Sequence, residues 1–473
     1  MPESTRKPNV IWFLVDQMRT QSLGIAGDPN AITPTLDRMA REGVWYREAL
    51  SGFPLCSPAR ACFLTGRYDH GVPFIGQRMR QDLPTFVDPL KQAGYRTAWF
   101  GKWHLDGHDK ARPAPRGDRH FVPRERRAGF DTWLGYEVLN QPQDCTIHGH
   151  DGDREVPFYR LPGHETGSLT DLLLDWLDGK EKEDDPFFAC VSVQPPHEPH
   201  FAPREWQEKF RPADQQLRPN VPGLPRIRAQ AREELAGYNA SIAHIDANVE
   251  RVLRRLRETG LDRDTYVVFF SDHGDCLGSH GFLRKQNPLE ESIRTPFIVW
   301  GGYDHSHHGR KGTDGRDCRS LLNHVDVPVT TLGLCGLEAP DGMAGYDYSG
   351  SVTGRDNPLP EPETAYLQGI WPCVWGKAYT TPWRGIVTRD GWKYVCQPHG
   401  VMHCFNLNED PYEEVDLAHH FDGHAARLRL QPLLRDWLDR LGDPFPLPDL
   451  PGWDWSPEPL AWQGATVHKT GSP

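Results

Sequence analysis

The stretch VIWFLV, residues 10–15, decides the fold. Six apolar residues in a row, with no polar residue between them, are typical of a strand that is buried on both faces. Such strands occur in parallel sheets that helices cover on both sides. Two polar residues, Asp16 and Gln17, follow the run at once. The sequence therefore predicts a buried parallel strand that carries Asp16 at its carboxyl end.

Further apolar runs of strand length follow along the chain, with helical patterns between them. The runs are TAWF (97–100), PFFACVSV (186–193), TYVVFF (265–270) and TPFIVW (295–300). Apolar residues recur at helical spacing over 168–179 and 234–260, and a glycine ends each segment. Strands that alternate with helices predict an α/β fold, in which a large, mixed but mostly parallel sheet lies between helices.

The chain is expected to divide into two domains and a tail, since 473 residues exceed one compact core. A main α/β domain is predicted over 7–345, before a linker rich in Pro and Gly. Short aromatic and β-branched runs over 360–442 predict a smaller C-terminal α+β subdomain, an antiparallel sheet plus a helix. The tail over 443–473 is rich in Pro and Trp, and we expect it to wrap a surface or a neighbouring subunit of a homo-oligomer.

Charge and composition exclude several classes of partner. The net charge is −12 and the pI is about 6.0, which argues against general binding to nucleic acid or to an anionic membrane. No apolar stretch reaches transmembrane length, and the first residues show no signal segment, so we expect a cytoplasmic protein. Ten cysteines without a C-x-x-C pair predict free thiols rather than a disulfide framework.

The segment FPLCSPARACFLTGR, residues 53–67, places a cysteine at the start of a predicted helix. Ser57 is a good N-cap, Pro58 suits the first helical position, and Gly66 can end the helix. Cys56 would then lie near outward-pointing backbone N–H groups, which favour a thiolate or another anion. The alternative is a small apolar side chain buried under a turn.

Polar residues follow four of the apolar runs, at the edge of the sheet where ligands bind in α/β folds. These residues are Asp16, Lys102 with His104, His197, and Asp272 with His273. Solvated strand ends are the alternative, but four such groups at one edge favour a functional site. Carboxylates with an imidazole suit a divalent cation, and surrounding cations suit a tetrahedral oxyanion ester, either sulfate or phosphate.

These segments closely resemble the type I sulfatases of the alkaline phosphatase superfamily, over about residues 9–417. CSPAR (56–60) with ACFLTGR (61–67) is similar to the family motif in which cysteine is oxidised to formylglycine after translation. GYRTAWFGKWH (94–104) resembles the second family motif. SDHGDCLGSHGFLRK (271–285) resembles the metal and lysine segment, and FNLNEDPYEEVDLA (405–418) resembles the closing phrase.

The resemblance implies the hydrolysis of sulfate monoesters by formylglycine, 3-oxoalanine, at position 56. The hydrated aldehyde is a gem-diol, of which one hydroxyl attacks sulfur and expels the alcohol. The second hydroxyl, once deprotonated, ejects sulfate and restores the aldehyde, a step that an ordinary serine cannot perform. A formylglycine-generating enzyme would read residues 57–60 on the unfolded chain.

The resemblance also assigns roles to single residues. Arg60 and Lys102 would hold the formylglycine and the sulfate oxygens, and His104 would be the base on the second hydroxyl. His197 and Lys285 would face the leaving oxygen and the sulfate. The implied metal ligands are Asp16, Cys56, Asp272 and His273.

Two positions depart from the pattern of many family members. Gln17 stands where many have a second acid, and His273 stands where many have asparagine. With fewer carboxylate oxygens, Ca²⁺ is still expected, and nitrogen ligation keeps Mn²⁺ and Mg²⁺ open. Gln17 is interpreted as a donor to a substrate oxygen, with a plain strand-end residue as the alternative. His200 is either a second donor in the substrate pocket or a packing residue.

Three functions remain open at this point. The first is sulfatase activity on a small-molecule or saccharide sulfate ester. The second is a phosphonate or phosphate diester hydrolase on the same scaffold, since such a site also tolerates phosphorus. The third is a binding homologue without activity, which the filled catalytic positions disfavour. An arginine-rich insertion over 112–127 is either a lid for an anionic sugar chain or a solvated loop.

Overall fold

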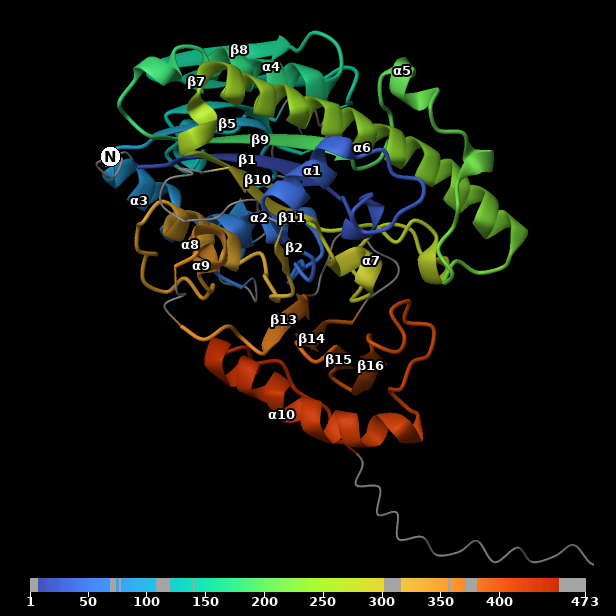
Figure 1. Ribbon diagram of the computed structural model, residues 1–473. Coiled ribbons are helices and arrows are strands. Elements are labelled where there is room, and N and C mark those ends of the chain that lie inside the picture. Colours follow the sequence, from blue (N-terminus) through green and yellow to red (C-terminus); the bar gives the residue numbers. More distant parts are fainter. Residues whose placement is uncertain are drawn as a thin grey trace, which may run out of the picture.

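The structure is a computed structural model that describes residues 7–68, 74–75, 78–107, 120–138, 141–301, 316–355, 359–370 and 381–450. Within these residues, the main domain is built on a ten-stranded sheet with the order β12-β2-β11-β10-β1-β9-β5-β6-β7-β8 (Figure 1). The strands are β1 (Asn9–Asp16), β2 (Val44–Tyr46), β5 (Arg96–Lys102), β6 (Thr132–Tyr136), β7 (Thr146–Asp151), β8 (Arg154–Arg160), β9 (Phe187–Pro196), β10 (Thr265–Ser271), β11 (Phe297–Gly301) and β12 (Arg316–Cys318). A short hairpin joins β3 (Phe74–Ile75) and β4 (Arg78–Met79).

The centre of the large sheet is parallel. Strand β1 pairs in parallel with β10 and β9, and β5 pairs in parallel with β9 and β6. Strands β11 and β7 flank this centre in antiparallel orientation. The predicted mixed, mostly parallel sheet is confirmed, and the carboxyl ends of its parallel strands share one edge.

Helices cover both faces of the large sheet. They are α1 (Pro34–Glu42), α2 (Cys56–Thr65), α3 (Val87–Gln92), α4 (Glu165–Leu177), α5 (Arg204–Gln207), α6 (Pro225–Thr259), α7 (Glu290–Ile293), α8 (Asp326–Leu334) and α9 (Ser349–Thr353). Short 3₁₀ segments lie at Thr20–Ser22, Arg124–Arg126, Lys180–Lys182, Pro212–Asp214, Leu261–Asp264, Ser279–Gly281 and Phe421–Gly423. Among the described residues, no helix combines the length and the apolar character that crossing a membrane requires.

Strand β1 is buried on both faces, as the run VIWFLV predicts. Ile11, Phe13 and Val15 pack into a core with α1, α4 and α6. Val10, Trp12 and Leu14 pack into the core on the other face, with α2, α3 and α8. Because β1 lies in the middle of the sheet between two layers of helices, the side chains of residues 10–15 are all buried, and all of them are apolar.

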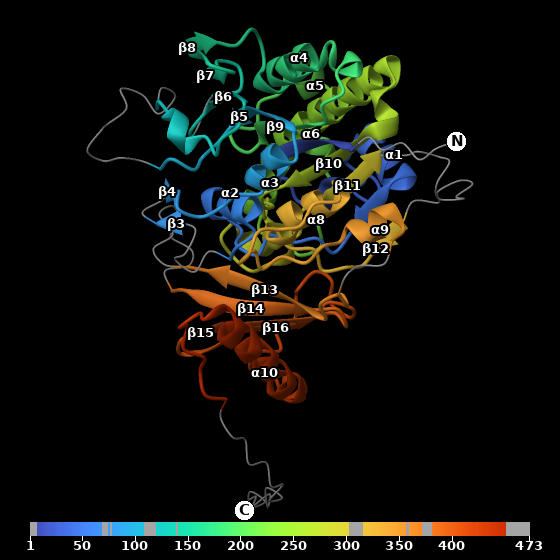
Figure 2. The same ribbon diagram turned by 90° about the vertical axis from the view of Figure 1, so that its left-hand side faces the viewer.

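The second domain is a four-stranded antiparallel sheet among the described residues, with one helix on its outer face (Figure 2). Its elements are β13 (Thr364–Gly369), β14 (Trp383–Thr388), β15 (Trp392–Gln397), β16 (Gly400–Asn406) and α10 (His424–Leu441). Tyr366 and Ile386 face α10, whereas Leu367 and Val395 pack with Leu50 of the main domain. This is the predicted α+β subdomain.

The exact domain boundaries stay a prediction. The large sheet ends with β12 and the small sheet begins with β13, on either side of the expected junction. The first residues of the predicted tail pack on the small sheet, since Asp443 pairs with Arg384 and Phe445 lies in the core beside α10. Residues 451–473 of that tail lie outside the described residues.

Candidate active site

Helix α2 presents Cys56 from its first turn. The helix begins at Cys56 and Leu55 is its N-cap residue, so the predicted start at Ser57 and Pro58 is wrong. Leu55 has extended backbone angles, and its carbonyl already accepts the N–H of Ala59 at 3.0 Å. Pro58 is tolerated at the third position, because the first N–H groups of a helix have no partner within it. Gly66 ends the helix at φ 63°, as predicted.

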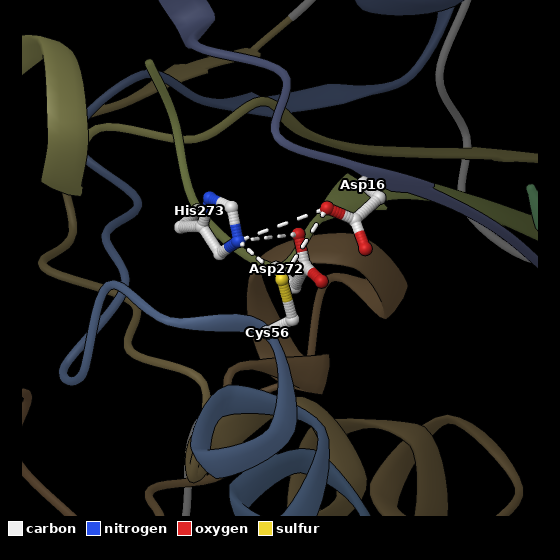
Figure 3. Close-up of side chains that lie close together, drawn as sticks. All are labelled: Asp16, Cys56, Asp272 and His273. Atoms are coloured by element: carbon white, nitrogen blue, oxygen red, sulfur yellow. Dashed lines mark hydrogen bonds and ion pairs between the residues drawn. The ribbon is translucent and has the colours of Figure 1, made fainter. Parts of the chain in front are cut away.

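Four buried side chains meet at the carboxyl edge of the sheet (Figure 3). Asp16 is the last residue of β1, and Asp272 and His273 directly follow the adjacent parallel strand β10. Cys56 Sγ lies 3.1 Å from His273 Nε2 and 3.6 Å from Asp16 Oδ1. The same nitrogen lies 3.6 Å from Asp272 Oδ1. The structure thus brings together the four residues predicted as metal ligands.

This group fits a divalent cation. One donor atom from each of the four residues lies within 4.8 Å of the others. His273 Nδ1 is within 3.0 Å of the Gly274 carbonyl, to which it can donate, and this leaves Nε2 as the donor toward a metal. Two carboxylates and an imidazole nitrogen are a donor set that Ca²⁺, Mn²⁺ and Mg²⁺ accept to different degrees.

Two cations, Arg60 and Lys102, pair with the carboxylates of the site. Arg60 is fully buried and contacts Asp272 Oδ2 at 3.1 Å and Asp16 Oδ2 at 3.2 Å. Lys102 Nζ lies 2.6 Å from the same oxygen of Asp16. Arg60 also donates to Ser192 Oγ and to the Lys102 carbonyl, both at 3.0 Å. The cations therefore hold the Oδ2 atoms, and the Oδ1 atoms face Cys56 and His273.

The cations decide the ionisation of the site. Burial and the nearby Cys56 oppose ionisation of Asp16, but Lys102 and other cations outweigh them and lower the pKa of this carboxyl well below its usual range. Burial also opposes ionisation of Cys56, yet Lys285, Lys102 and His273 lower the pKa of the thiol well below its ordinary value. The cations around position 56 therefore stabilise a negative charge on this residue.

His104 lies beside Cys56, and each of the two side chains affects the pKa of the other. Burial lowers the pKa of His104 to about 4, although the contact with Cys56 acts in the opposite direction. Its Nδ1 is buried and has no hydrogen-bond partner among the described residues. The imidazole is thus neutral at neutral pH, which is the form that can accept a proton.

Gln17 lies in a polar network rather than open to a substrate. Its amide nitrogen donates to Glu198 Oε2 at 2.8 Å and to Asp275 Oδ2 at 2.5 Å. Its amide oxygen accepts from Lys285 Nζ. Both N–H groups of this amide are therefore used within the protein, and the predicted donation to a substrate oxygen gains no support from the structure.

The two histidines after β9 differ in whether a ring nitrogen remains available to a substrate. His197 is 8% exposed, and its Nδ1 faces the backbone carbonyl and the carboxylate of Glu198 at 2.7 and 3.3 Å. This leaves Nε2 as the nitrogen that can face a substrate. His200 contacts the Pro196 carbonyl through Nδ1 and Glu234 through Nε2, at 2.7 and 2.8 Å. The substrate-binding interpretation of His200 thus stays a prediction, and its contacts are those of a packing residue.

Several supporting residues were missed in the sequence. Ser51 Oγ donates to the Asp272 carbonyl at 2.8 Å, and His324 lies 3.2 Å from that hydroxyl. Tyr238 lies at an apolar position of the helical repeat over 234–260, but its hydroxyl donates to the Gln17 carbonyl at 2.7 Å. Neither Ser51 nor His324 lies in a recognisable motif, whereas Tyr238 carried the signal of a polar atom on a buried helix face.

A second group of possible ligands has the wrong charge balance for a metal. His280, Glu291 and Glu413 also lie within 4.8 Å of one another. Arg218 contacts Glu291 at 2.8 Å and Lys393 contacts Glu413 at 2.5 Å, so both carboxylates are already neutralised. His280 belongs to this group and not to the site around Cys56.

The arginine-rich insertion is only partly described. Residues 112–119, with its first three arginines, lie outside the described residues. Arg126 pairs with the buried Asp106, and Arg127 is fully buried over the rings of Phe121 and Trp133. These two arginines therefore have structural contacts, and the lid interpretation stays a prediction.

The site combines two buried carboxylates and an imidazole with the cations Arg60 and Lys102 and with a cysteine at a helix N-terminus. This combination is typical of a hydrolase that acts on tetrahedral oxyanion esters. The Sulfatase family model matches residues 8–337. The chain therefore belongs to the sulfatase family, in the alkaline phosphatase superfamily, and is a sulfatase. The fold and the family predicted from the sequence are confirmed.

Relatives and solved structures agree with this assignment. The chain is 33% identical to the ulvan-active sulfatase of Formosa agariphila over 93% of this chain and 82% of that protein. It is 31% identical to an endo-4-O-sulfatase of Bacteroides thetaiotaomicron over 78% of each. A Bacteroides fragilis crystal structure that carries the sulfatase name yidJ superposes with a TM-score of 0.82 at 25% identity, over 94% of this chain and 98% of that one.

Proposed function

We propose that the protein hydrolyses sulfate monoesters of a carbohydrate, with formylglycine made from Cys56 and one divalent metal, Ca²⁺ as first choice. The observation that carries this proposal is the position of Cys56 Sγ between Asp16 and His273, at 3.6 and 3.1 Å. Two relatives, an ulvan-active sulfatase and an endo-4-O-sulfatase, support a saccharide substrate.

Formylglycine, when formed, would supply a hydrated aldehyde with one hydroxyl for attack and another for release of sulfate. The metal would be held by Asp16, Asp272, His273 and residue 56, and would supply a Lewis acid beside the sulfate oxygens. A formylglycine-generating enzyme would be the partner in maturation. The cytoplasmic location and the homo-oligomer expected from the sequence stay predictions.

The remaining residues position charge and move protons. Arg60 and Lys102 hold Asp16 in place and present positive charge beneath residue 56. His104, neutral and beside residue 56, can take the proton whose loss starts sulfate release. His197 and Lys285 would give a proton or positive charge to the leaving oxygen.

Peptide mass spectrometry tests the modification. The peptide with Cys56 should lose about 18 Da, the difference between a cysteine thiol and the formylglycine aldehyde, and turnover should scale with the modified fraction. A fully active sample with an intact thiol would contradict the proposal.

The role of His197 is tested with two sulfate esters, one of an activated phenol and one of a sugar alcohol. General acids contribute about 10²–10⁴-fold, and most where the leaving alkoxide is a strong base. His197→Ala should therefore slow the sugar ester far more than the phenol ester. Equal losses on both esters would show that His197 does not protonate the leaving group.

A phosphonate or phosphate diester hydrolase is the second candidate. The phosphonate monoester hydrolase of Agrobacterium radiobacter shares the fold, with a TM-score of 0.71 at 21% identity over 92% of this chain and 96% of that one. Paired sulfate and phosphonate esters of one alcohol separate the two functions. A higher kcat/KM for the phosphonate would reverse the assignment.

A further inference from the structure

We propose that Glu137 is a positioning residue for His104, which it holds through the backbone that follows this histidine. Nothing in the sequence marks Glu137, which lies 33 residues beyond His104 (137 minus 104). The inference rests on the proposed role of His104 as the base in sulfate release. It identifies Glu137 as the group that holds His104 in position.

Glu137 stands at the end of a strand beside the site. Strand β6 ends at Tyr136, next to the end of β5 at Lys102, and Glu137 follows directly. Its side chain is buried, with 1% of the residue exposed. A carboxylate in such a place needs hydrogen-bond donors, because burial without them is costly.

Three consecutive backbone N–H groups supply these donors. Leu105 N–H donates to Glu137 Oε2 at 3.2 Å, and the N–H groups of Asp106 and Gly107 donate to Oε1 at 2.8 Å each. Successive N–H groups that converge on one anion form a concave binding site for negative charge. Glu137 therefore fixes the course of residues 105–107 as one unit.

His104 lies between this unit and a second fixed point. On its other side, Trp103 is fully buried and its N–H donates to the Tyr136 carbonyl at 2.8 Å. His104 itself has φ 61°, a left-handed backbone conformation that is unfavourable for a residue with a side chain. Such a conformation persists only where the surroundings impose it. Glu137 and Tyr136 impose it from the two sides.

Opposing effects act on the ionisation of Glu137. Burial and the neighbouring Asp106 raise the pKa of Glu137 to about 7, while the backbone N–H groups and His120 act to lower it. Asp106, in the same loop, is paired with His120 at 2.7 Å and with Arg126. A glutamine of the same size would turn an NH₂ group toward one of the three N–H donors. That backbone N–H would lose its hydrogen-bond acceptor, and the loop would no longer be held in the same position.

The experiment is a cycle of Glu137→Gln, His104→Ala and the double variant in the mature, metal-loaded enzyme. We expect E137Q to lower kcat by about 10²-fold, the effect of a misplaced catalytic group, with little change in KM. Because Glu137 acts through His104, the double variant should be no slower than H104A alone. Hydrogen exchange of the amides of residues 105–107 should be faster in E137Q.

Asp246→Asn is the matched control. Asp246 is also a buried carboxylate that accepts two backbone N–H groups, those of Thr35 and Leu36 at 3.1 and 2.8 Å, but at the start of α1. It should leave kcat and the exchange of residues 105–107 unchanged. If E137Q does not fold, Glu137→Asp keeps the charge with a shorter reach and should show the same loss of kcat to a smaller extent.

The outcomes distinguish the proposed base role of His104 from the proposed positioning role of Glu137. An H104A enzyme with full kcat would refute the base role in the proposed function. If H104A is impaired, then an E137Q enzyme with full kcat, losses that multiply in the double variant, or unchanged exchange at residues 105–107 would refute the positioning role alone.

Discussion

Arg60→Met removes a buried guanidinium that pairs with both buried acids of the site. Arg60 contacts Asp16 and Asp272 at 3.2 and 3.1 Å, and all three side chains have no exposed surface. Methionine fills much of the same space without charge, so the change isolates the loss of the two ion pairs. We expect the variant to be less stable, and to regain part of its stability when a divalent cation binds.

The magnitude follows from the burial of the three groups. Removing one partner of a buried ion pair costs about 3–5 kcal/mol, because a charge is left in the interior without compensation. This corresponds to about 10²–10⁴-fold in the unfolding equilibrium. A divalent cation next to the two carboxylates replaces part of the lost charge, so Arg60→Met should gain more from the metal than the unchanged protein does. At a concentration of 100 times its Kd, the metal raises the free energy of unfolding of a protein that binds it only when folded by about 2.7 kcal/mol.

The assay is urea unfolding followed by near-ultraviolet circular dichroism, once with a chelator and once with excess Ca²⁺. Arg384→Met is the matched control, since Arg384 is also a buried arginine and pairs with Asp443 at 2.7 Å in the second domain. The stability gap of Arg384→Met should not depend on the metal, and its kcat should be normal. A gap for Arg60→Met that is equal with and without Ca²⁺, or no gap at all, would refute the reasoning.

Three further predictions concern the metal, the backbone and the pH dependence. Asp272→Ala should abolish metal binding in calorimetry together with turnover, and full activity after exhaustive chelation would exclude a metal role. Gly101→Ala should reduce expression and thermal stability, because a Cβ atom at this position would lie 2.1 Å from the Ser192 carbonyl oxygen; normal stability would show that the strands can separate. Burial opposes ionisation of Glu234, but hydrogen bonds from its histidine and arginine partners lower its pKa to about 2. Its stabilising effect is therefore complete above about pH 4.5 and is lost as the pH falls toward 2. Because Glu234 is partly screened by solvent, Glu234→Gln should cost about 1–2 kcal/mol at neutral pH and progressively less below pH 4.5, measured by urea unfolding at each pH; a cost that does not change with pH would contradict the assignment.

The central strands of the sheet could be predicted because they are buried on both faces. Val10 to Val15 form a continuous apolar run, and Asp16 ends it at the edge where the site lies. The long helix could be predicted only in part. Its apolar face begins near Leu235, but α6 starts at Pro225, since its first turns are largely exposed and lack an apolar repeat. A pattern that depends on burial says little about a segment that is not buried.

The candidate site could be predicted where one motif carries each residue. Cys56 and Arg60 lie on one short helix, and Lys102 and His104 at one strand end, so local sequence places them. The contacts of Gln17 could not be predicted, because its three partners come from positions 198, 275 and 285. Only the folded chain brings such distant segments together.

These contacts of Gln17 explain why a neutral residue stands there. Its N–H groups are shared by Glu198 and Asp275 at 2.8 and 2.5 Å, and its oxygen receives Lys285. A carboxylate in its place would meet two other carboxylates at hydrogen-bond distance, and repulsion in a buried site is costly. The amide therefore links the acids to Lys285, and the candidate metal ligands are two carboxylates, one imidazole and residue 56. The acidic neighbours of Gln17 thus account for its departure from the pattern of two consecutive acids.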